Sequence, residues 1–368
     1  PDSAVIAERV GRPVAAVLCL QAPLELFHAC GVHPYKIFGG SQTAPRLSGP
    51  SLPAVMCPML RSALGLLLLD SAEGGAEAQG AGYAGWVIPT TCDWVVKFPE
   101  MMRACGRPIE RPVHMMELPH LKDRPGSQER WLEEVYALRD FLASLGGRKP
   151  DRRQLLASMR VYQEAWGAFS ELTELKREGR LPALWFSVIT NAFFFDSVER
   201  WIEHVRAVAA KFRSAEPAGK GVFLAGSPIF FPNLKILHLL EDAGLNPVID
   251  DLCSAERLFP GAVFYDDPTE YGLLKAMAQR YHQGCLCPTF ADNDRRVNNI
   301  VSPANRGLFG GVVFQVLKGC HPFDLESLSL EQRLKDEGLK YIKLETDYTA
   351  EDSQNLLTRL EAYRSTLD

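Results

Sequence analysis

The sequence predicts an α/β protein, and two observations support this class. Short apolar segments typical of buried strands alternate with amphipathic helical patterns towards both ends of the chain. A stretch of long helical patterns without strands separates the two series. The 368 residues also exceed the usual size of a single domain. We therefore expect two flavodoxin- or Rossmann-like parallel-sheet domains, over residues 1–125 and 217–368, joined by a helical connector over residues 126–216.

The N-terminal series contains three predicted strands and two predicted helices. The apolar segments Val14–Leu20, Gly85–Pro89 and His114–Leu118 have the length and composition of buried strands. Leu24–Cys30 has a helical pattern that ends before a glycine, and Pro53–Leu69 is a long apolar helical pattern. These elements predict one α/β unit.

The middle of the chain predicts helices only. The segments Gln128–Gly146 and Asp151–Gly179 carry 3.6-residue periodicity and are rich in Glu, Arg and Leu. Their charged residues Glu174, Lys176 and Arg177 are typical of a solvated helix face. We expect this part to connect the two α/β units.

The C-terminal series alternates strand and helix patterns most clearly. Turn residues such as Gly226, Pro228 and Gly244 separate the elements. The predicted strands are Gly221–Ala225, Pro247–Asp250, 310–317 and Tyr341–Glu345, and the predicted helices are Asn233–Asp242, Tyr271–Tyr281, Leu325–Glu337 and Asp352–Ser365. Such a βαβ series predicts a parallel sheet with helices on both faces.

Composition and charge exclude several classes of protein. Hydrophobic residues at 46% and charged residues at 23% are values of a globular chain rather than a disordered or fibrous one. The net charge of −5 offers no basic excess for a phosphate backbone, so we expect no nucleic acid partner. The longest apolar run, Leu64–Leu69, is far shorter than a membrane span, so we expect no membrane partner.

Nine cysteines are the most distinctive feature of the composition. Six of them lie in predicted loops, either just after a strand or beside a proline at a helix end, and loops at the carboxyl ends of parallel strands are where ligands collect. These six are Cys57, Cys92, Cys253, Cys285, Cys287 and Cys320. Because loop thiols of two domains can converge, a thiol-bound metal becomes the leading hypothesis.

The spacing of these cysteines decides which metal to consider. The chain has no Cys-x-x-Cys pair, which makes a structural zinc site a poor fit. Iron–sulfur clusters accept thiolates from several loops, and six thiolates could hold two cubes at three apiece. Any single cysteine can equally be a buried core residue. That interpretation is kept for Cys19, inside a predicted strand, and for Cys30 and Cys105, near helix ends.

Several motifs together resemble one family, the subunits of 2-hydroxyacyl-CoA dehydratases and benzoyl-CoA reductases, from about residue 14 to the end. The N-terminal motifs are Pro23-Leu24-Glu25-Leu26, Ala29-Cys30-Gly31, Cys57-Pro58 and Thr91-Cys92-Asp93. The C-terminal motifs are Asp250-Asp251-Leu252-Cys253, Lys318-Gly319-Cys320-His321 and Glu345-Thr346-Asp347-Tyr348. The motif Gly284-Cys285-Leu286-Cys287, with Cys253, is most similar to the family's double-cubane branch.

The resemblance implies a cofactor and its ligands. Three cysteines hold a 4Fe-4S cluster in the dehydratase subunits, and their spacing resembles that of Cys57, Cys92 and Cys320. In the double-cubane branch, two cubes joined by a sulfide form an 8Fe-9S cluster held by six cysteines. The six loop cysteines agree with that number. Because Cys57 and Cys92 belong to the first α/β unit and the other four to the second, we expect the cluster to lie between the units.

The resemblance also implies a function with alternatives. We expect an enzyme, an iron–sulfur oxidoreductase of the double-cubane type that receives low-potential electrons from an ATP-hydrolysing 4Fe-4S activator and reduces a small molecule. The first alternative is the 4Fe-4S subunit of a 2-hydroxyacyl-CoA dehydratase, a lyase that removes water from an acyl-CoA, and the second is a non-enzymatic electron carrier. The chain contains no Gly-x-x-x-x-Gly-Lys-Ser/Thr or Gly-x-Gly-x-x-Gly motif, so the energy should come from a partner.

Further expectations concern the surroundings of the cluster and of the protein. No catalytic residue is predicted. Lys97, His321 and Arg295 are candidates to supply positive charge near a reduced cluster. Exposed surface charge is the favoured interpretation of Lys97 and Arg295, and capping of the helix that follows is the alternative for His321. The family's usual acid, Glu25, has a structural role in the first helix turn as its alternative. Relatives pair α/β subunits, and oxygen destroys low-potential clusters, so we expect a homodimer in the cytoplasm of an anaerobic organism.

Overall fold

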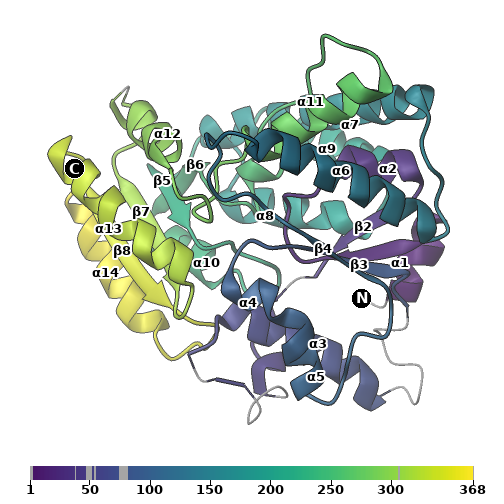
Figure 1. The fold of residues 1–368 in the computed structure, drawn as a ribbon. Coiled ribbons are helices and arrows are strands. Elements are labelled where there is room, and N and C mark those ends of the chain that lie inside the picture. Colours follow the sequence, from purple (N-terminus) through teal and green to yellow (C-terminus); the bar gives the residue numbers. More distant parts are fainter. Residues whose placement is uncertain are drawn as a thin grey trace.

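The computed structural model describes residues 3–37, 39–46, 52–53, 55–73, 82–305 and 307–367, which form two four-stranded parallel sheets (Figure 1). The strand orders are β2-β1-β3-β4 and β6-β5-β7-β8, and all neighbours are parallel. In each sheet the strand order changes direction between two central strands, which are β1 and β3 in the first sheet and β5 and β7 in the second. Open α/β sheets bind ligands at such a point. The predicted α/β class with two parallel-sheet domains is confirmed.

The strands are short, and most are buried on both faces, as parallel sheets require. Their bounds are β1 (Val14–Val17), β2 (His33–Lys36), β3 (Gly85–Pro89), β4 (Val113–Met116), β5 (Lys220–Gly226), β6 (Leu245–Asp250), β7 (Val312–Leu317) and β8 (Tyr341–Thr346). Strand β2 is absent from the sequence prediction because it contains a proline. Pro34 is tolerated there because β2 is an edge strand.

The helices surround both sheets and fill the connector. Their bounds are α1 (Ser3–Val10), α2 (Leu24–Cys30), α3 (Pro58–Glu73), α4 (Asp93–Val96), α5 (Phe98–Ala104), α6 (Ser127–Ser144), α7 (Arg152–Arg177), α8 (Ala183–Ala192), α9 (Val198–Phe212), α10 (Lys235–Asp242), α11 (Glu270–His282), α12 (Asp294–Asn305), α13 (His321–Asp336) and α14 (Ser353–Ser365). Helix α7 begins with a capping box in which the Asp151 side chain accepts from the Gln154 N–H at 2.8 Å and Gln154 bonds back.

Two boundaries differ from the sequence prediction in ways that matter for the site. Helix α3 begins at Pro58 rather than at Pro53, because Pro58 occupies the first helical position that proline favours, and this leaves Cys57 outside the helix. Strand β1 ends at Val17, so Cys19 lies beyond the strand and not inside it. The second change moves Cys19 from the interior of a strand to the loop at the carboxyl end of β1.

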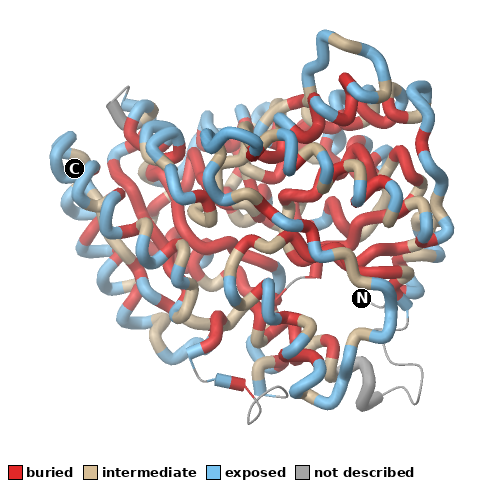
Figure 2. The backbone as a smooth tube through the Cα atoms, viewed as in Figure 1, coloured by how far each residue is buried: buried red, intermediate tan, exposed pale blue. Residues whose placement is uncertain are grey.

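Three hydrophobic clusters hold the layers together. The largest joins one face of each sheet through helices α7, α8 and α9, so the connector packs on both sheets. The second covers the other face of the first sheet, and the third covers the other face of the second sheet. The strands are accordingly buried, and exposed residues lie on the outer surfaces of the helices (Figure 2).

Helix α11 packs against the first sheet and α6, and not with the cluster of the second sheet to which its neighbours in the sequence belong. Its residues Leu273, Leu274 and Met277 belong to the same cluster as Trp131 of α6 and Val17 of β1. The turn with Cys285 and Cys287, which follows α11, therefore lies against the first sheet, although the sequence assigned it to the second unit. The domain boundaries at residues 125 and 216 stay a prediction.

A buried ion network closes the loop after β6. Lys176 on α7 is fully buried, and its Nζ lies 2.6 Å from Asp250 Oδ2 and 2.6 Å from Glu256 Oε1. Burial lowers the pKa of Lys176, but the two carboxylates outweigh it, so the pKa is raised and the ammonium stays charged. The expectation that Lys176 lies on a solvated face is wrong, because α7 is covered on this side by the second domain.

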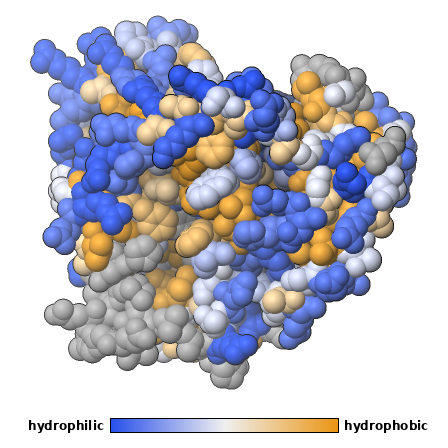
Figure 3. All heavy atoms as spheres, turned by 180° about the vertical axis from the view of Figure 1, so that it is seen from behind, coloured by the Kyte–Doolittle hydropathy of each residue, from blue (hydrophilic) through white to orange (hydrophobic). Residues whose placement is uncertain are grey.

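The surface seen in Figure 3 is hydrophilic over most of its area, with hydrophobic residues gathered in a central band. Among the described residues, no helix has the length and apolar character that a membrane span needs.

We expect Lys176→Met to lower the free energy of unfolding by about 3–5 kcal/mol, because Asp250 and Glu256 would be left as uncompensated buried charges. Urea denaturation measures the change. Arg206→Met is the matched control, since Arg206 is exposed and 3.8 Å from Glu164, and such surface pairs contribute at most about 1 kcal/mol. Equal losses in the two variants would contradict the role given to Lys176.

Candidate metal centre

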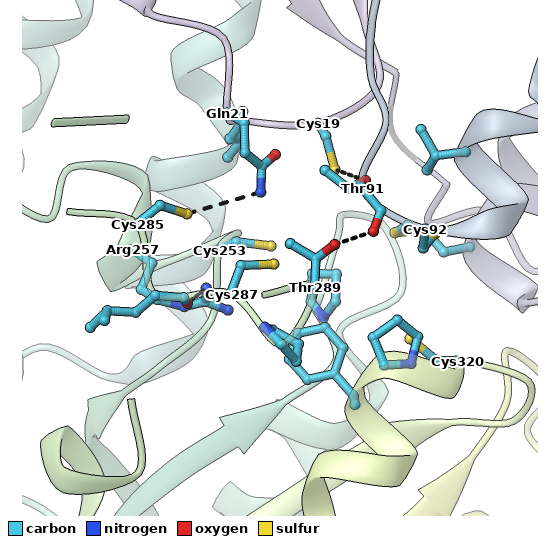
Figure 4. A pocket seen from close by; sticks show the side chains of 18 of the residues that line it. Cys19, Gln21, Thr91, Cys92, Cys253, Arg257, Cys285, Cys287, Thr289 and Cys320 are labelled. Carbon is cyan, nitrogen blue, oxygen red and sulfur yellow. Dashed lines mark hydrogen bonds between the residues drawn. The ribbon is translucent and has the colours of Figure 1, made fainter. Parts of the chain in front are cut away.

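A cavity lies where the carboxyl ends of the two sheets face each other, and seven cysteines line it (Figure 4). They are Cys19, Cys57, Cys92, Cys253, Cys285, Cys287 and Cys320. The cavity volume is about 130 Å³, which is more than a single ion needs. The other lining residues are mostly apolar, and among the residues that the structure describes no aspartate, glutamate or histidine lines the cavity.

The topology explains why these loops meet. Cys19 and Cys92 follow β1 and β3, the two strands between which the first sheet reverses its order. Cys320 follows β7, and Ser227 follows its neighbour β5, at the corresponding place in the second sheet. The cavity therefore lies at the switch points of both sheets at once, which is the usual ligand position in this class of fold.

Cys57, Cys92 and Cys320 form one group, here called the first triad. Each of them directly precedes a helix, namely α3, α4 and α13. The chain can bring Cys57 beside Cys320 because Gly319 has φ +76° and no Cβ. A Cβ at this position would lie 2.2 Å from the Val55 carbonyl oxygen. A side chain at position 319 would force the two loops apart.

Neutral hydrogen-bond donors surround the first triad. The Cys57 and Cys320 side chains share a hydrogen bond that lowers the pKa of Cys57 and raises that of Cys320. Burial raises the pKa of Cys92 to about 12, and the backbone N–H of Val95 opposes this. Ser227 likewise lowers the pKa of Cys320 through a side-chain hydrogen bond.

Cys253, Cys285 and Cys287 form the second triad. Cys253 comes from the loop after β6, and the other two come from the turn after α11. Burial raises the pKa of all three thiols, and the charge of Arg257 opposes this for each of them. Arg257 lies on this side of the pocket in Figure 4, whereas Cys92 and Cys320 lie on the other.

Cys19 lies between the triads. Thr91 Oγ1 donates a hydrogen bond to its sulfur at 3.2 Å, and Gln21 Nε2 lies 4.0 Å from the sulfur of Cys285. The sequence prediction kept Cys19 as a core residue because it extended β1 too far. Cys30 and Cys105 lie at the ends of α2 and α5 and do not line the cavity, as expected.

The cations at the cavity are not the three candidates, and the surface role favoured for Lys97 and Arg295 is confirmed. Lys97, His321 and Arg295 are exposed and do not line it. Lys36, Arg257 and Arg280 do. The sequence has little signal for these three, because a lysine in an edge strand, an arginine in a loop and an arginine on a helix usually face solvent.

The donor set indicates a group larger than one ion. Within the described part of the chain, no three His, Cys, Asp or Glu side chains stand close enough together to hold a single metal ion. Thiol sulfur is a soft ligand typical of iron–sulfur clusters, and a cluster spans the distance between thiols that one ion cannot. The residues present therefore fit a polynuclear iron–sulfur group.

Glu25 lies behind the cavity and joins two helices. Its carboxyl group is buried, and its Oε2 accepts a hydrogen bond from Tyr281 Oη at 2.8 Å, while that hydroxyl accepts from the Leu24 N–H at 3.1 Å. Burial raises the pKa of Glu25 above its usual value. Since Tyr281 itself lines the cavity, this contact holds α11 and its cysteine turn against α2.

Comparison with known proteins places the chain among related sequences. The family model described as 2-hydroxyglutaryl-CoA dehydratase, D-component, matches residues 19–367. A protein of Escherichia coli strain K12 named as dehydratase subunit YjiM is 24% identical, covering 96% of this chain and 91% of that protein. The (R)-phenyllactyl-CoA dehydratase beta subunit of Clostridium sporogenes is 22% identical over 98% of this chain and 93% of its own length. A benzoyl-CoA reductase subunit of Thauera aromatica is 23% identical, with coverages of 90% and 84%.

We expect Glu25→Gln to remove a pH-dependent loss of stability. The raised pKa means that the folded protein keeps the Glu25 proton where the unfolded chain has lost it, so wild-type stability falls as pH rises above about 4.5. A tenfold difference in proton affinity between the folded and unfolded states corresponds to about 1.4 kcal/mol of stability. Anaerobic urea unfolding between pH 4.5 and 8 should show that the free energy of unfolding of the variant increases relative to that of the wild type as pH rises. Parallel curves would contradict a buried neutral carboxyl.

Proposed function

The chain belongs to the 2-hydroxyglutaryl-CoA dehydratase D-component family and is an enzyme of that family, and within it we propose an iron–sulfur reductase of the double-cubane type. The observation that carries this proposal is the presence of two triads of thiols in the lining of one cavity, with Cys253, Cys285 and Cys287 near Arg257 and with Cys92 and Cys320 on the other side (Figure 4). A single 4Fe-4S cluster with three cysteines would employ the first triad and leave the second without a role. An 8Fe-9S cluster employs both.

Each triad would hold one half of the cluster. Cys57, Cys92 and Cys320 would hold one cube, and Cys253, Cys285 and Cys287 the other. When bound, such a cluster supplies electron transfer at very low potential and iron that is open to a small ligand. The apolar lining would exclude water from that iron, and the buried cations would compensate the negative charge of a reduced cluster.

The relatives favour one alternative. The (R)-phenyllactyl-CoA dehydratase and lactoyl-CoA dehydratase beta subunits cover nearly the whole chain at 22% and 20% identity. A 4Fe-4S dehydratase subunit acting on an acyl-CoA is therefore the second candidate, and the iron content separates the two.

Partners complete the proposal. The relatives are named as subunits, which supports a protein that works with other chains. We include an ATP-hydrolysing 4Fe-4S activator as the electron donor, because the sequence has no phosphate-binding loop of its own. We also include pairing with a second copy of this chain and a location in the cytoplasm of an anaerobic organism.

Alanine at each of the six triad cysteines should lower bound iron, because each thiolate holds one iron of the cluster. Anaerobic purification followed by iron and acid-labile sulfide analysis measures this, with about eight irons per chain expected in the wild type and about four for the alternative. The matched control is Cys105→Ala, since Cys105 lies outside the cavity. Equal iron loss in this control would overturn the assignment.

Cys19→Ala forms a separate arm of the same experiment. The structure places Cys19 in the cavity, so this variant decides between six ligands and seven. Unchanged iron would keep the set at six, whereas a loss as large as that of Cys92→Ala would add Cys19.

Reduction of the wild-type protein by dithionite alone should be incomplete, and the activator with ATP should complete it, because the proposed cluster works at very low potential and the chain has no recognisable nucleotide loop of its own. Electron paramagnetic resonance and the visible spectrum follow the reduction. The control omits ATP from the mixture with the activator. Complete reduction by dithionite, with no further change on adding activator and ATP, would favour a simple electron carrier.

A further inference from the structure

The two sides of the cavity are built from different kinds of charge. The groups that act most strongly on the first triad are backbone N–H groups, the Ser227 hydroxyl and the other thiols. The second triad instead lies among full positive charges. Arg257 Nη1 donates to the Leu286 carbonyl and Lys122 Nζ donates to the Cys285 carbonyl, so two cations bind the turn that carries Cys285 and Cys287.

Arg257 is the central cation on this side. Its side chain is 9% exposed, and its Nε lies 2.9 Å from Asp251 Oδ1. Its Nη2 is buried and has no hydrogen-bond partner among the described residues. A buried N–H without an acceptor is costly. Because Arg257 lines the cavity, this donor is available to an acceptor bound there, and a cluster sulfur beside the second triad would satisfy it.

Other cations reinforce the same side. Lys36 is 3% exposed, and its charge acts on Cys253. Its Nζ donates to the Leu18 carbonyl. Arg280 lines the cavity and acts on Cys285.

The charges that oppose this difference between the two sides of the cavity are smaller than the charges of the cations. Asp251 offsets part of the Arg257 charge, but Arg296 Nη2 lies 2.5 Å from Asp251 Oδ2 and shares that carboxylate. The long helices α3 and α13 direct their N-termini at the first triad and contribute about half a charge each. The full charges of the three cations that line the cavity, Lys36, Arg257 and Arg280, exceed these partial charges. The second triad therefore has the more positive surroundings.

We propose that Arg257 makes the side of the cavity with Cys253, Cys285 and Cys287 the more easily reduced one, so that the first electron delivered resides there. The inference rests on the double-cubane function proposed above. In this step the external donor is oxidised by one electron and iron on the second-triad side is reduced. No bond forms or breaks, and the added negative charge is stabilised by Arg257 and its Nη2 hydrogen bond.

Anaerobic redox titration followed by electron paramagnetic resonance tests the proposal in wild type, Arg257→Gln and Arg257→Lys. In Arg257→Gln the equilibrium constant of the first reduction step should fall about tenfold, a shift of about 59 mV for one electron, with a smaller change in the second step. Arg257→Lys should retain most of the wild-type potential, because it keeps the charge. Arg295→Gln is the matched control, since Arg295 is exposed, is not among the residues that line the cavity, and donates to the Gln283 carbonyl.

A variant on the other side gives the crossed test. Ser227→Ala removes the hydroxyl that bonds Cys320 and should shift the second step while leaving the first unchanged. If Arg257→Gln binds less iron than wild type, Lys36→Met replaces it, because it removes a cation from the same side without disturbing Asp251. Unchanged potentials in the Arg257 variants, or a shift confined to the second step, would overturn the proposal.

Failure of the inference and failure of the function give different results. If the protein binds about eight irons per chain but the Arg257 variants leave the potential of the first reduction step unchanged, the inference is wrong and the double-cubane function still stands. About four irons per chain removes the double-cubane function, and the inference with it, before any variant is titrated.

Discussion

The buried ion network around Lys176 is the interaction on which the site depends. A loop can be buried only if its polar groups find partners. Asp250 Oδ1 accepts from the N–H groups of Leu252 and Glu256, and the Asp250 N–H donates to Glu256, so the loop is closed at both ends. Lys176, which lies on the connector helix α7, forms ion pairs with both carboxylates. Cys253 lies within this loop and Arg257 directly follows it, and both are positioned by it.

A second network of buried charges links the loop after β6 to helices α12 and α13. Arg257 and Arg296 share Asp251, and Arg296 reaches Glu326 at 2.7 Å. These side chains are almost fully buried and come from the β6 loop, α12 and α13. Because a buried charge without its partner is strongly unfavourable, each element restrains the others. The three segments behind the second triad and beside Cys320 therefore form one rigid unit.

The repetition of one strand order explains the position and chemistry of the cavity. Two sheets of order 2-1-3-4 face each other at their carboxyl edges, so each contributes its switch-point loops to a shared space. Packing of α11 on the first sheet brings a turn from the second half of the chain to the opposite wall. One wall thus presents thiols with backbone N–H groups, and the other presents thiols with guanidinium and ammonium groups. Equal ligands in unequal surroundings are a physical basis for two halves of a cluster that differ in potential.

The sequence by itself determined the fold class, the C-terminal order of elements and the family. Apolar strand segments, capping residues and short cysteine motifs are local features, and local features can be recognised without coordinates. Only the tertiary structure decided that Cys19 belongs to the cavity, that α11 packs on the first sheet, and that Lys176 and Arg257 are buried while Lys97 and Arg295 are exposed. The reason is that the burial of a charged side chain depends on partners far away in the chain, such as Asp250 for Lys176, and no local pattern in the sequence records those partners.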